Sequence, residues 1–231
     1  MNPRFSPFSS ASSVPLSASF NAKALWLLTL ALALTIVGVA LGVTLALPIL
    51  ASGWIILLFI GELAIVWTAP VWSRSSPLNV ILFAAFPILS GITLTPIIIS
   101  VLAGYANGAS ILMNALIATV LLTASSAVMA KTYSNLGGIV GPFLLQSLIG
   151  LIVFGILQLF IPALRGTAFE MIASGVGIVT FALFLAVDIQ RLLRRGDATS
   201  PFLLAIGLYL DIYNLFLYVL RFMLATSGRR R

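Results

Sequence analysis

Three acidic residues interrupt runs of otherwise apolar sequence, and they are the first candidates for chemistry. Glu62 lies in WIILLFIGELAIVW, Asp188 in FALFLAVDIQRLL, and Asp211 in LYLDIYNLFLYVLRFM. A charge at the centre of a bilayer costs about 2.5–3.5 kcal/mol on translocon scales, and such residues mark ion or proton pathways by default. Each of these carboxylates is therefore weighed as a functional group.

The residue types that are missing narrow the chemistry further. The chain has no His and no Cys, which leaves few ligands for zinc, copper, haem or iron–sulfur sites and excludes thiol catalysis. A response to pH near neutrality would have to come from a carboxylate, since His is absent. We expect no enzyme activity and no tightly bound cofactor.

The composition is that of a membrane protein. The chain is 61% hydrophobic and only 7% charged, whereas a soluble domain has about 25% charged residues. The net charge of +7 comes from basic residues beside apolar runs, a distribution that sets membrane orientation. The expected partner is therefore membrane lipid, and a nucleic-acid partner is not supported.

Seven apolar segments follow one another along the chain, each near the length that crosses a hydrocarbon core of about 30 Å. They lie at about 24–47, 53–72, 78–101, 109–130, 138–161, 168–193 and 202–224. We predict an all-α membrane protein with seven transmembrane helices. Residues 1–22 are predicted to form a disordered Ser- and Pro-rich tail, residues 23–225 the transmembrane domain, and residues 226–231 a basic C-terminal tail.

Basic residues between the segments favour a cytosolic N-terminus. Seven spans then place one set of basic residues in the cytosol: Arg4, Lys23, Arg74, Lys131, Arg191, Arg194 and Arg195. The trailing Arg229, Arg230 and Arg231 would lie outside, against the rule, unless the last segment re-enters. The side of the C-terminus is left open. The expected location is a bacterial inner membrane.

With this topology the three intramembrane acids come to similar depths. At 1.5 Å per residue, Asp188 lies about 8 Å from the cytosolic end of its segment, Asp211 about 14 Å and Glu62 about 15 Å. Glu170 and Asp197 lie in or beside loops and are predicted to be solvated. Three helices would thus place carboxylates in one layer of the cytosolic half.

Polar neighbours indicate that these acids face the interior of the bundle. Asn214 and Tyr218 follow Asp211 at spacings of three and seven, which forms a polar stripe on one helix face. Arg191 follows Asp188 at a spacing of three, and Arg74 is another candidate partner. The structural alternative is an Asp–Arg pair that only holds the bundle together. Arg221 is expected to reach the far interface.

Several stretches together resemble the Bax inhibitor family, also called transmembrane Bax inhibitor motif proteins, and in particular its bacterial calcium-leak member. They are GITLTP (91–96), SNLGGIVGPFLL (134–145), FALFLAVDIQRLL (181–193) and LYLDIYNLFLYVLRFM (208–223). The resemblance covers the second to the seventh segments. It implies seven helices, of which the last is central and surrounded by the other six.

The resemblance also implies a pH-sensitive calcium leak channel gated by an Asp pair, here Asp188 and Asp211. Glu62 matches the acid of the second helix. Arg74 loosely matches an arginine that latches the closed pore, although its spacing from Glu62 is about one residue long and Pro70 intervenes. Val187 stands where the family usually has a small polar or aromatic residue.

Physical chemistry is consistent with this interpretation. Two carboxylates in a poorly solvated site cannot easily both ionise, so the pair would titrate as a unit. Calcium takes six to eight oxygen ligands, which Asp188, Asp211, Glu62, Asn214, carbonyls and water would supply in part. A weak site suits a leak, because tight binding would block conduction.

Other functions remain open from the sequence. A non-conducting scaffold that regulates membrane proteases or cell-death and stress partners would use the two Asp residues for stability alone. An intramembrane aspartyl protease also needs two Asp residues, but the G-x-G expected before the second one is absent at Asp211. A proton-coupled transporter would use the carboxylates as a relay.

Overall fold

The computed structural model describes residues 16–194 and 200–227, and all of their long elements are helices. Apolar runs bounded by Gly, Pro and Asn form helices because, in lipid, a helix satisfies every backbone polar group within one segment. The elements are α1 (Leu16–Ser52), α2 (Trp54–Trp72), α3 (Leu78–Gly104), α4 (Gly108–Thr132), α5 (Leu136–Phe160), the short 3-10 helix η1 (Pro162–Arg165), α6 (Thr167–Arg194) and α7 (Pro201–Thr226).

Each predicted apolar segment corresponds to one of the seven α-helices of the described chain. All seven are long and apolar enough to cross a membrane, and the shortest span has 19 residues, or about 28 Å of helix. The chain is therefore a multi-pass membrane protein. The predicted tail differs at one boundary, because α1 already begins at Leu16. Residues 1–15, which include Arg4, lie outside the described residues.

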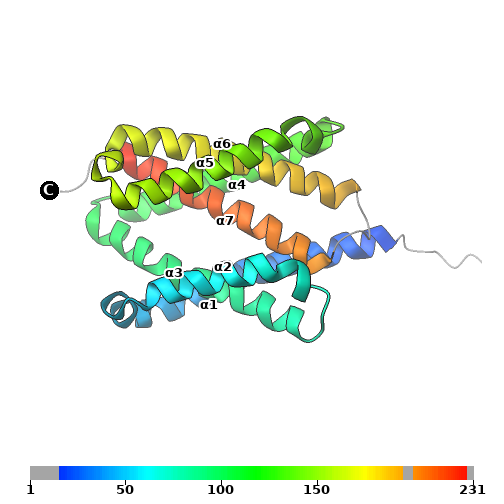
Figure 1. The fold of residues 1–231 in the computed structure, drawn as a ribbon, viewed down its shortest axis with the longest axis horizontal. Helices are drawn as coiled ribbons and strands as arrows, with labels where there is room; N and C mark the ends of the chain where they lie inside the picture. Colours follow the sequence, from blue (N-terminus) through cyan, green and yellow to red (C-terminus); the bar gives the residue numbers. More distant parts are fainter. Residues whose placement is uncertain (1–15, 195–199, 228–231) are drawn as a thin grey trace, which may run out of the picture.

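Helix α7 is the most buried of these helices. More than half of its spanning window, 56%, is buried, compared with 11% for α2. Its main neighbours are α1, α4 and α6, with further contacts to α2 and α3. Figure 1 shows α7, in orange to red, between a group formed by α4, α5 and α6 and a group formed by α1, α2 and α3. A ring of all six helices stays a prediction, since α5 packs mainly on α6.

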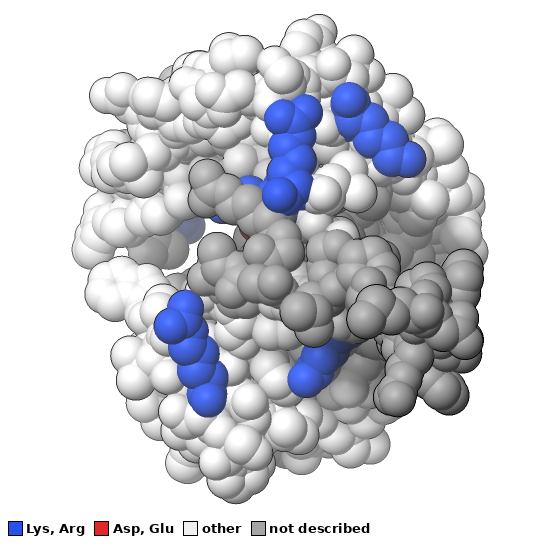
Figure 2. Space-filling view, turned by 90° about the vertical axis from the view of Figure 1, so that its right-hand side faces the viewer, with Lys and Arg blue, Asp and Glu red and all other residues white. Residues whose placement is uncertain are grey.

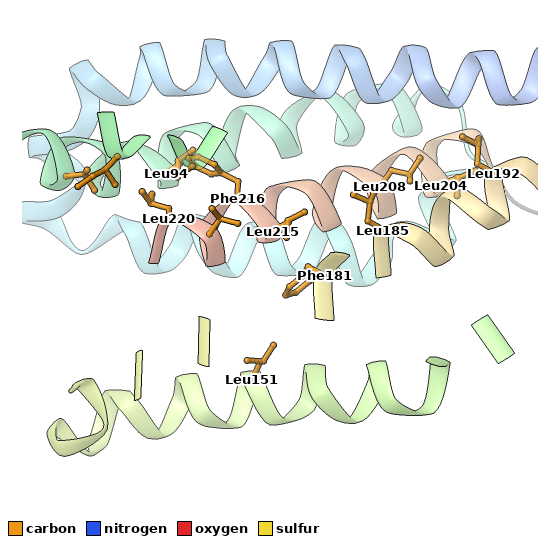
Figure 3. Close-up of a cluster of buried hydrophobic side chains, with 14 of the residues drawn as sticks. Leu94, Leu151, Phe181, Leu185, Leu192, Leu204, Leu208, Leu215, Phe216 and Leu220 are labelled. Carbon is orange, nitrogen blue, oxygen red and sulfur yellow. The ribbon is translucent and has the colours of Figure 1, made fainter. Parts of the chain in front are cut away.

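A continuous apolar core follows α7 along its length. Leu208 and Leu215 are fully buried within one cluster that also includes Leu185 of α6 and Leu94 of α3. Figure 3 shows Leu208 and Leu215 along α7, with Leu185 of α6 and Leu94 of α3 beside this helix. Packing among helices in lipid depends on such close van der Waals contact, because lipid tails are as apolar as the side chains.

Helices α1 and α3 cross with their backbones close together. A Cβ atom built on Gly91 would lie only 2.7 Å from the Val39 amide nitrogen, and one on Gly38 only 2.9 Å from the Ile88 carbonyl carbon. Only glycine allows two backbones to approach so closely. This crossing ties α1 to α3 and so holds one side of the bundle around α7.

One end of the bundle, which we call the basic end, gathers the start of α1 and the α2–α3, α4–α5 and α6–α7 connections. The hydroxyl of Ser200 donates to the Ser73 carbonyl oxygen at 2.8 Å, and Arg194 Nη2 donates to the Tyr133 carbonyl oxygen at 3.0 Å. The ammonium of Lys23 lies 5.7 Å from the Phe202 ring centroid. Figure 2 views this end and shows Lys and Arg side chains spread over it.

The described chain ends at the opposite end of the bundle, which we call the far end. Ser227 lines a hollow there together with Tyr105 and Arg165, and Figure 1 shows the end of α7 on the side away from the start of α1. Helix α7 therefore passes through the whole bundle without re-entering. The predictions for Arg195, for Asp197 and for the terminal Arg229, Arg230 and Arg231 lie outside the described residues.

Candidate functional site

The structure brings Asp188 of α6 against the backbone of α7, one helical turn from Asp211. A Cβ atom built on Gly207 would lie 2.6 Å from Asp188 Oδ2, so the missing side chain leaves room for the carboxylate. Gly207 and Asp211 are four residues apart and share one face of α7. The two Asp residues are close enough for their charges to interact.

Asp211 is the more buried member of this pair. Its exposed fraction is 7%, and its Oδ2 atom has no hydrogen-bond partner among the described residues. A buried carboxylate without a partner costs stability in proportion to its lost hydration. An apolar residue in this place would avoid that cost, and a functional role for Asp211 stays a prediction.

Asp188 connects the pair to the basic end. Its Oδ1 atom accepts a hydrogen bond from Arg191 Nη1 at 2.7 Å, and their side chains are 13% and 59% exposed. The guanidinium thus approaches Asp188 from the side of the open basic end. Gln190 and Arg194, on the same stretch of α6, donate to carbonyl oxygens at the end of α4 and in the α4–α5 connection.

Glu62 of α2 forms a second, separate polar site with α3. Its Oε1 atom accepts from the Thr93 hydroxyl at 2.8 Å, and its Oε2 atom accepts from the Ser90 hydroxyl at 3.4 Å. The Tyr213 hydroxyl of α7 donates to the Ser90 carbonyl oxygen at 2.9 Å. Glu62 is 8% exposed, but its carboxylate has hydroxyl partners that Asp211 Oδ2 lacks.

The three carboxylates do not converge on one point. Within residues 16–194 and 200–227, no group of three acidic side chains is close enough to hold a metal ion together. The three predicted calcium ligands therefore lie in two separate polar sites, and calcium binding at either site stays a prediction. One is the Asp pair between α6 and α7, and the other is Glu62 between α2 and α3.

Two further predicted site residues lie apart from the Asp pair. Arg74 follows the end of α2 at the basic end, where it is exposed, and it forms no ion pair with a described residue. Arg191 pairs with Asp188 instead. Asn214 donates from its side chain to the Leu210 carbonyl oxygen of its own helix at 2.8 Å and lines a hollow of about 480 Å³ beside α3.

The structure also shows a polar cluster at the far end, which was not predicted from the sequence. Arg221 Nη2 of α7 lies 2.9 Å from Glu170 Oε2 of α6. Gln158 joins both, since its Nε2 donates to Glu170 Oε1 at 2.7 Å and its Oε1 accepts from Arg221 at 3.2 Å. Glu170 was expected to lie in or beside a loop and to be solvated. It does lie beside a connection, in the first turn of α6, but its carboxylate pairs with Arg221 and Gln158.

A signal for this cluster was present in the sequence. Glu170 begins the sixth segment and Arg221 ends the seventh, so antiparallel neighbours bring the two charges to the same end of the bundle. Helices joined by a short connection commonly pack as antiparallel neighbours. We call Gln158, Glu170 and Arg221 the outer cluster.

Comparison with known proteins fits this architecture. Residues 17–229 match the family model described as inhibitor of apoptosis-promoting Bax1. The chain belongs to the Bax inhibitor family. The match extends from the first turn of α1 to beyond the end of α7, so it includes all seven α-helices of the described chain.

Relatives within the Bax inhibitor family come from bacteria and plants. An uncharacterized protein of Campylobacter jejuni is 31% identical over 176 residues, which are 76% of this chain and 73% of that protein. The BI1-like protein of Arabidopsis thaliana is 29% identical over 178 residues, 74% of this chain and 65% of its own length. Protein LIFEGUARD 1 of the same plant is 28% identical over 174 residues, which cover 74% and 70% of the two chains.

Proposed function

We propose that this protein is a pH-sensitive, calcium-permeable leak channel in which Asp188 and Asp211 sense pH and gate the path. The observation that carries the proposal is the buried, unpartnered Oδ2 atom of Asp211 beside a second carboxylate inside a membrane bundle, as far as the described residues extend. Intramembrane carboxylates of this kind mark ion or proton pathways. The chain belongs to the Bax inhibitor family, and the motifs around Asp188 and Asp211 resemble its bacterial calcium-leak member.

Calcium is the proposed permeant ion because the candidate residues offer oxygen. The Asp pair has four carboxylate oxygens, and calcium takes six to eight oxygen ligands. Carbonyl groups and water would supply the others, so binding would be weak and release fast, as conduction requires. Glu62 and Asn214 are proposed as two further polar positions along the path.

Gating by pH would follow from the charges of the pair. When both carboxylates are ionised in a poorly solvated site, they repel each other and favour separation of α6 from α7 at this point. When they share a proton, or when Arg191 neutralises Asp188, the helices stay packed. The proposed channel therefore conducts more at alkaline than at acidic pH. A latch role for Arg74 stays a prediction and would require its exposed side chain to move.

The proposed location is a bacterial inner membrane with the basic end in the cytosol. That end carries Lys23, Arg74, Lys131, Arg191 and Arg194, whereas the residues that line the far-end hollow include Arg165 and Arg221. An excess of Lys and Arg in short connections favours the cytosolic side. Bacterial relatives agree with such a source membrane.

The test is calcium influx into liposomes that contain the purified protein, measured at pH 6, 7 and 8. The variants Asp188→Asn and Asp211→Asn are measured alongside, with circular dichroism and size-exclusion profiles to show that they are folded. Flux that rises with pH in the wild type and loses this dependence in either variant supports the channel. Folded and inserted protein without flux rules it out.

The second candidate is a non-conducting membrane scaffold that regulates proteases or cell-death and stress partners. The description of the matched family, which concerns inhibition of an apoptosis-promoting protein, favours this candidate. The same experiment separates the two functions. A scaffold would show no flux at any pH, and the Asp variants would change only its thermal stability.

A further inference from the structure

In the outer cluster, the positively charged guanidinium of Arg221 lies among side-chain oxygen atoms. The guanidinium of Arg221 contacts both carboxylate oxygens of Glu170, at 3.2 and 2.9 Å, and the amide oxygen of Gln158 at 3.2 Å. The three oxygens come from two helices, α5 and α6, and the cation from a third, α7. Gln158 is 7% exposed, and its amide also donates to the Leu164 carbonyl oxygen at 3.0 Å, so its position is fixed.

This cluster stands between two hollows of the far end. The outer hollow, of about 620 Å³, is lined by Glu170, Arg221 and Thr226 among others. The inner hollow, of about 480 Å³, is lined by Asn214, Tyr218 and Arg221 among others. Arg221 borders both, and Asn214 lies three residues from Asp211 along α7. The side chain of Arg221 therefore lies at the boundary between the outer hollow and the inner hollow.

We propose that Glu170 and Gln158 form an outer cation site of the pathway, which Arg221 fills when the path is closed and a divalent cation fills when it opens. A divalent cation that binds these oxygens displaces the guanidinium, and the displaced side chain connects the two hollows. Hard divalent cations prefer such carboxylate and amide oxygens. The inference rests on the proposed function for its role in conduction, but the site itself can be tested without flux.

The chain has no cysteine, so a single introduced cysteine reports access. The probe is Asn214→Cys in proteoliposomes, labelled from outside by a small, cationic, membrane-impermeant thiol reagent, with the rate measured on molecules whose far end faces out. The matched control is Thr226→Cys, because Thr226 lines the outer hollow but not the inner one. We expect slow labelling at position 214 and fast labelling at position 226.

Glu170→Gln gives the decisive comparison. The substitution removes a negative charge that attracts the cationic reagent, so simple electrostatics predicts slower labelling at position 214. Release of Arg221 predicts the opposite, an increase of at least about fivefold, with no increase at position 226. The charge exchange Glu170→Arg with Arg221→Glu rebuilds the pair and restores slow labelling. Unchanged or slower labelling in Glu170→Gln overturns the proposal.

The effect of calcium on the labelling rate is the second test. Millimolar calcium is expected to speed labelling at position 214 in the Asn214→Cys protein and to have no effect when Glu170→Gln is added. If calcium does not change the labelling rate of the Asn214→Cys protein, the cation site is refuted, whatever the rates in the other variants are. Because labelling needs no ion flux, labelling that follows the proposal in a protein without flux would refute the channel and leave the site intact.

Discussion

The carboxylate of Asp188 on α6 lies in the space that a side chain at Gly207 of α7 would fill. Its Oδ2 atom is 2.6 Å from an ideal Cβ atom at position 207. Asp211 lies one turn further along the same face of α7. The absence of a side chain at one residue thus decides how near two carboxylates in a membrane approach each other.

The first prediction concerns this contact. Gly207→Ala places a methyl group against Asp188 Oδ2, so the carboxylate has to move away from α7 and from Asp211. The charges then interact less, and the pH at which calcium flux is half-maximal is expected to fall. The measurement is liposome flux across a pH series. The matched control is Gly175→Ala on α6, where a Cβ atom meets nothing within 4 Å and no change is expected. An unchanged pH profile in Gly207→Ala would contradict the prediction.

The second prediction concerns the stability of the buried acid. Asp211→Asn removes the charge of a buried carboxylate whose Oδ2 atom has no partner among the described residues, and a buried charge without a partner destabilises the fold. We expect a higher Tm than the wild type at pH 8, by about 2–4 °C for each kcal/mol. The gain should shrink as the pH falls, because protonation removes the charge of the wild-type residue.

Asp188→Asn is the comparison for that measurement. It breaks an ion pair with the largely exposed Arg191, and such pairs contribute about 0–1 kcal/mol. Its Tm should change little at pH 8 or at lower pH. A lower Tm for Asp211→Asn at pH 8 would show that Asp211 stabilises the fold and would favour a structural role.

The third prediction separates Glu62 from the Asp pair. Glu62→Gln keeps an oxygen that accepts from the Thr93 hydroxyl but removes one charge from the proposed path. A unit charge 4 Å from an ion contributes about 1–4 kcal/mol between bulk water and a protein surface, so calcium flux should fall roughly tenfold or more. The pH dependence should persist, since the two sites are separate. Loss of pH dependence in Glu62→Gln would show that the sites are coupled.

The fourth prediction compares the two candidate arginine partners of Asp188. Arg191→Gln removes the guanidinium that lies 2.7 Å from Asp188, so the carboxylate pair loses its neutralising charge and the pH profile of flux should shift. Arg74→Gln removes an exposed side chain. It should shift the pH profile of flux less than Arg191→Gln does if the Arg191–Asp188 pair is the one present in the closed channel. A larger shift for Arg74→Gln would assign the latch to Arg74.

The fifth prediction concerns the crossing of α1 and α3. Gly91→Ala forces a methyl group against the Thr35 carbonyl oxygen and to within 2.7 Å of the Val39 amide nitrogen. Overpacking of this kind costs about 1–3 kcal/mol, so Tm should fall. Gly150→Ala on α5, where nothing lies within 4 Å, should leave Tm unchanged or slightly higher. Equal Tm values for the two variants would show that the helices separate without cost.

The number of spans and their approximate limits follow from the sequence alone. Long apolar runs must form helices in lipid, because no water is available for the backbone. The same rule identifies Glu62, Asp188 and Asp211 as costly residues from their positions within apolar runs. The prediction that Asp188 pairs with Asp211 also came from the sequence, because the motifs that resemble the Bax inhibitor family contain both residues.

Only the tertiary structure decided which polar groups meet. The sequence suggested one layer of three carboxylates, but depth along a helix says nothing about the direction in which a side chain faces. The rotation of each helix about its axis places Glu62 toward Ser90 and Thr93 of α3, and it places the Asp pair between α6 and α7. Arg221 and Glu170, 51 residues apart, pair because α6 and α7 are antiparallel neighbours. Side-chain partners across helices depend on packing, and packing is a property of the whole bundle.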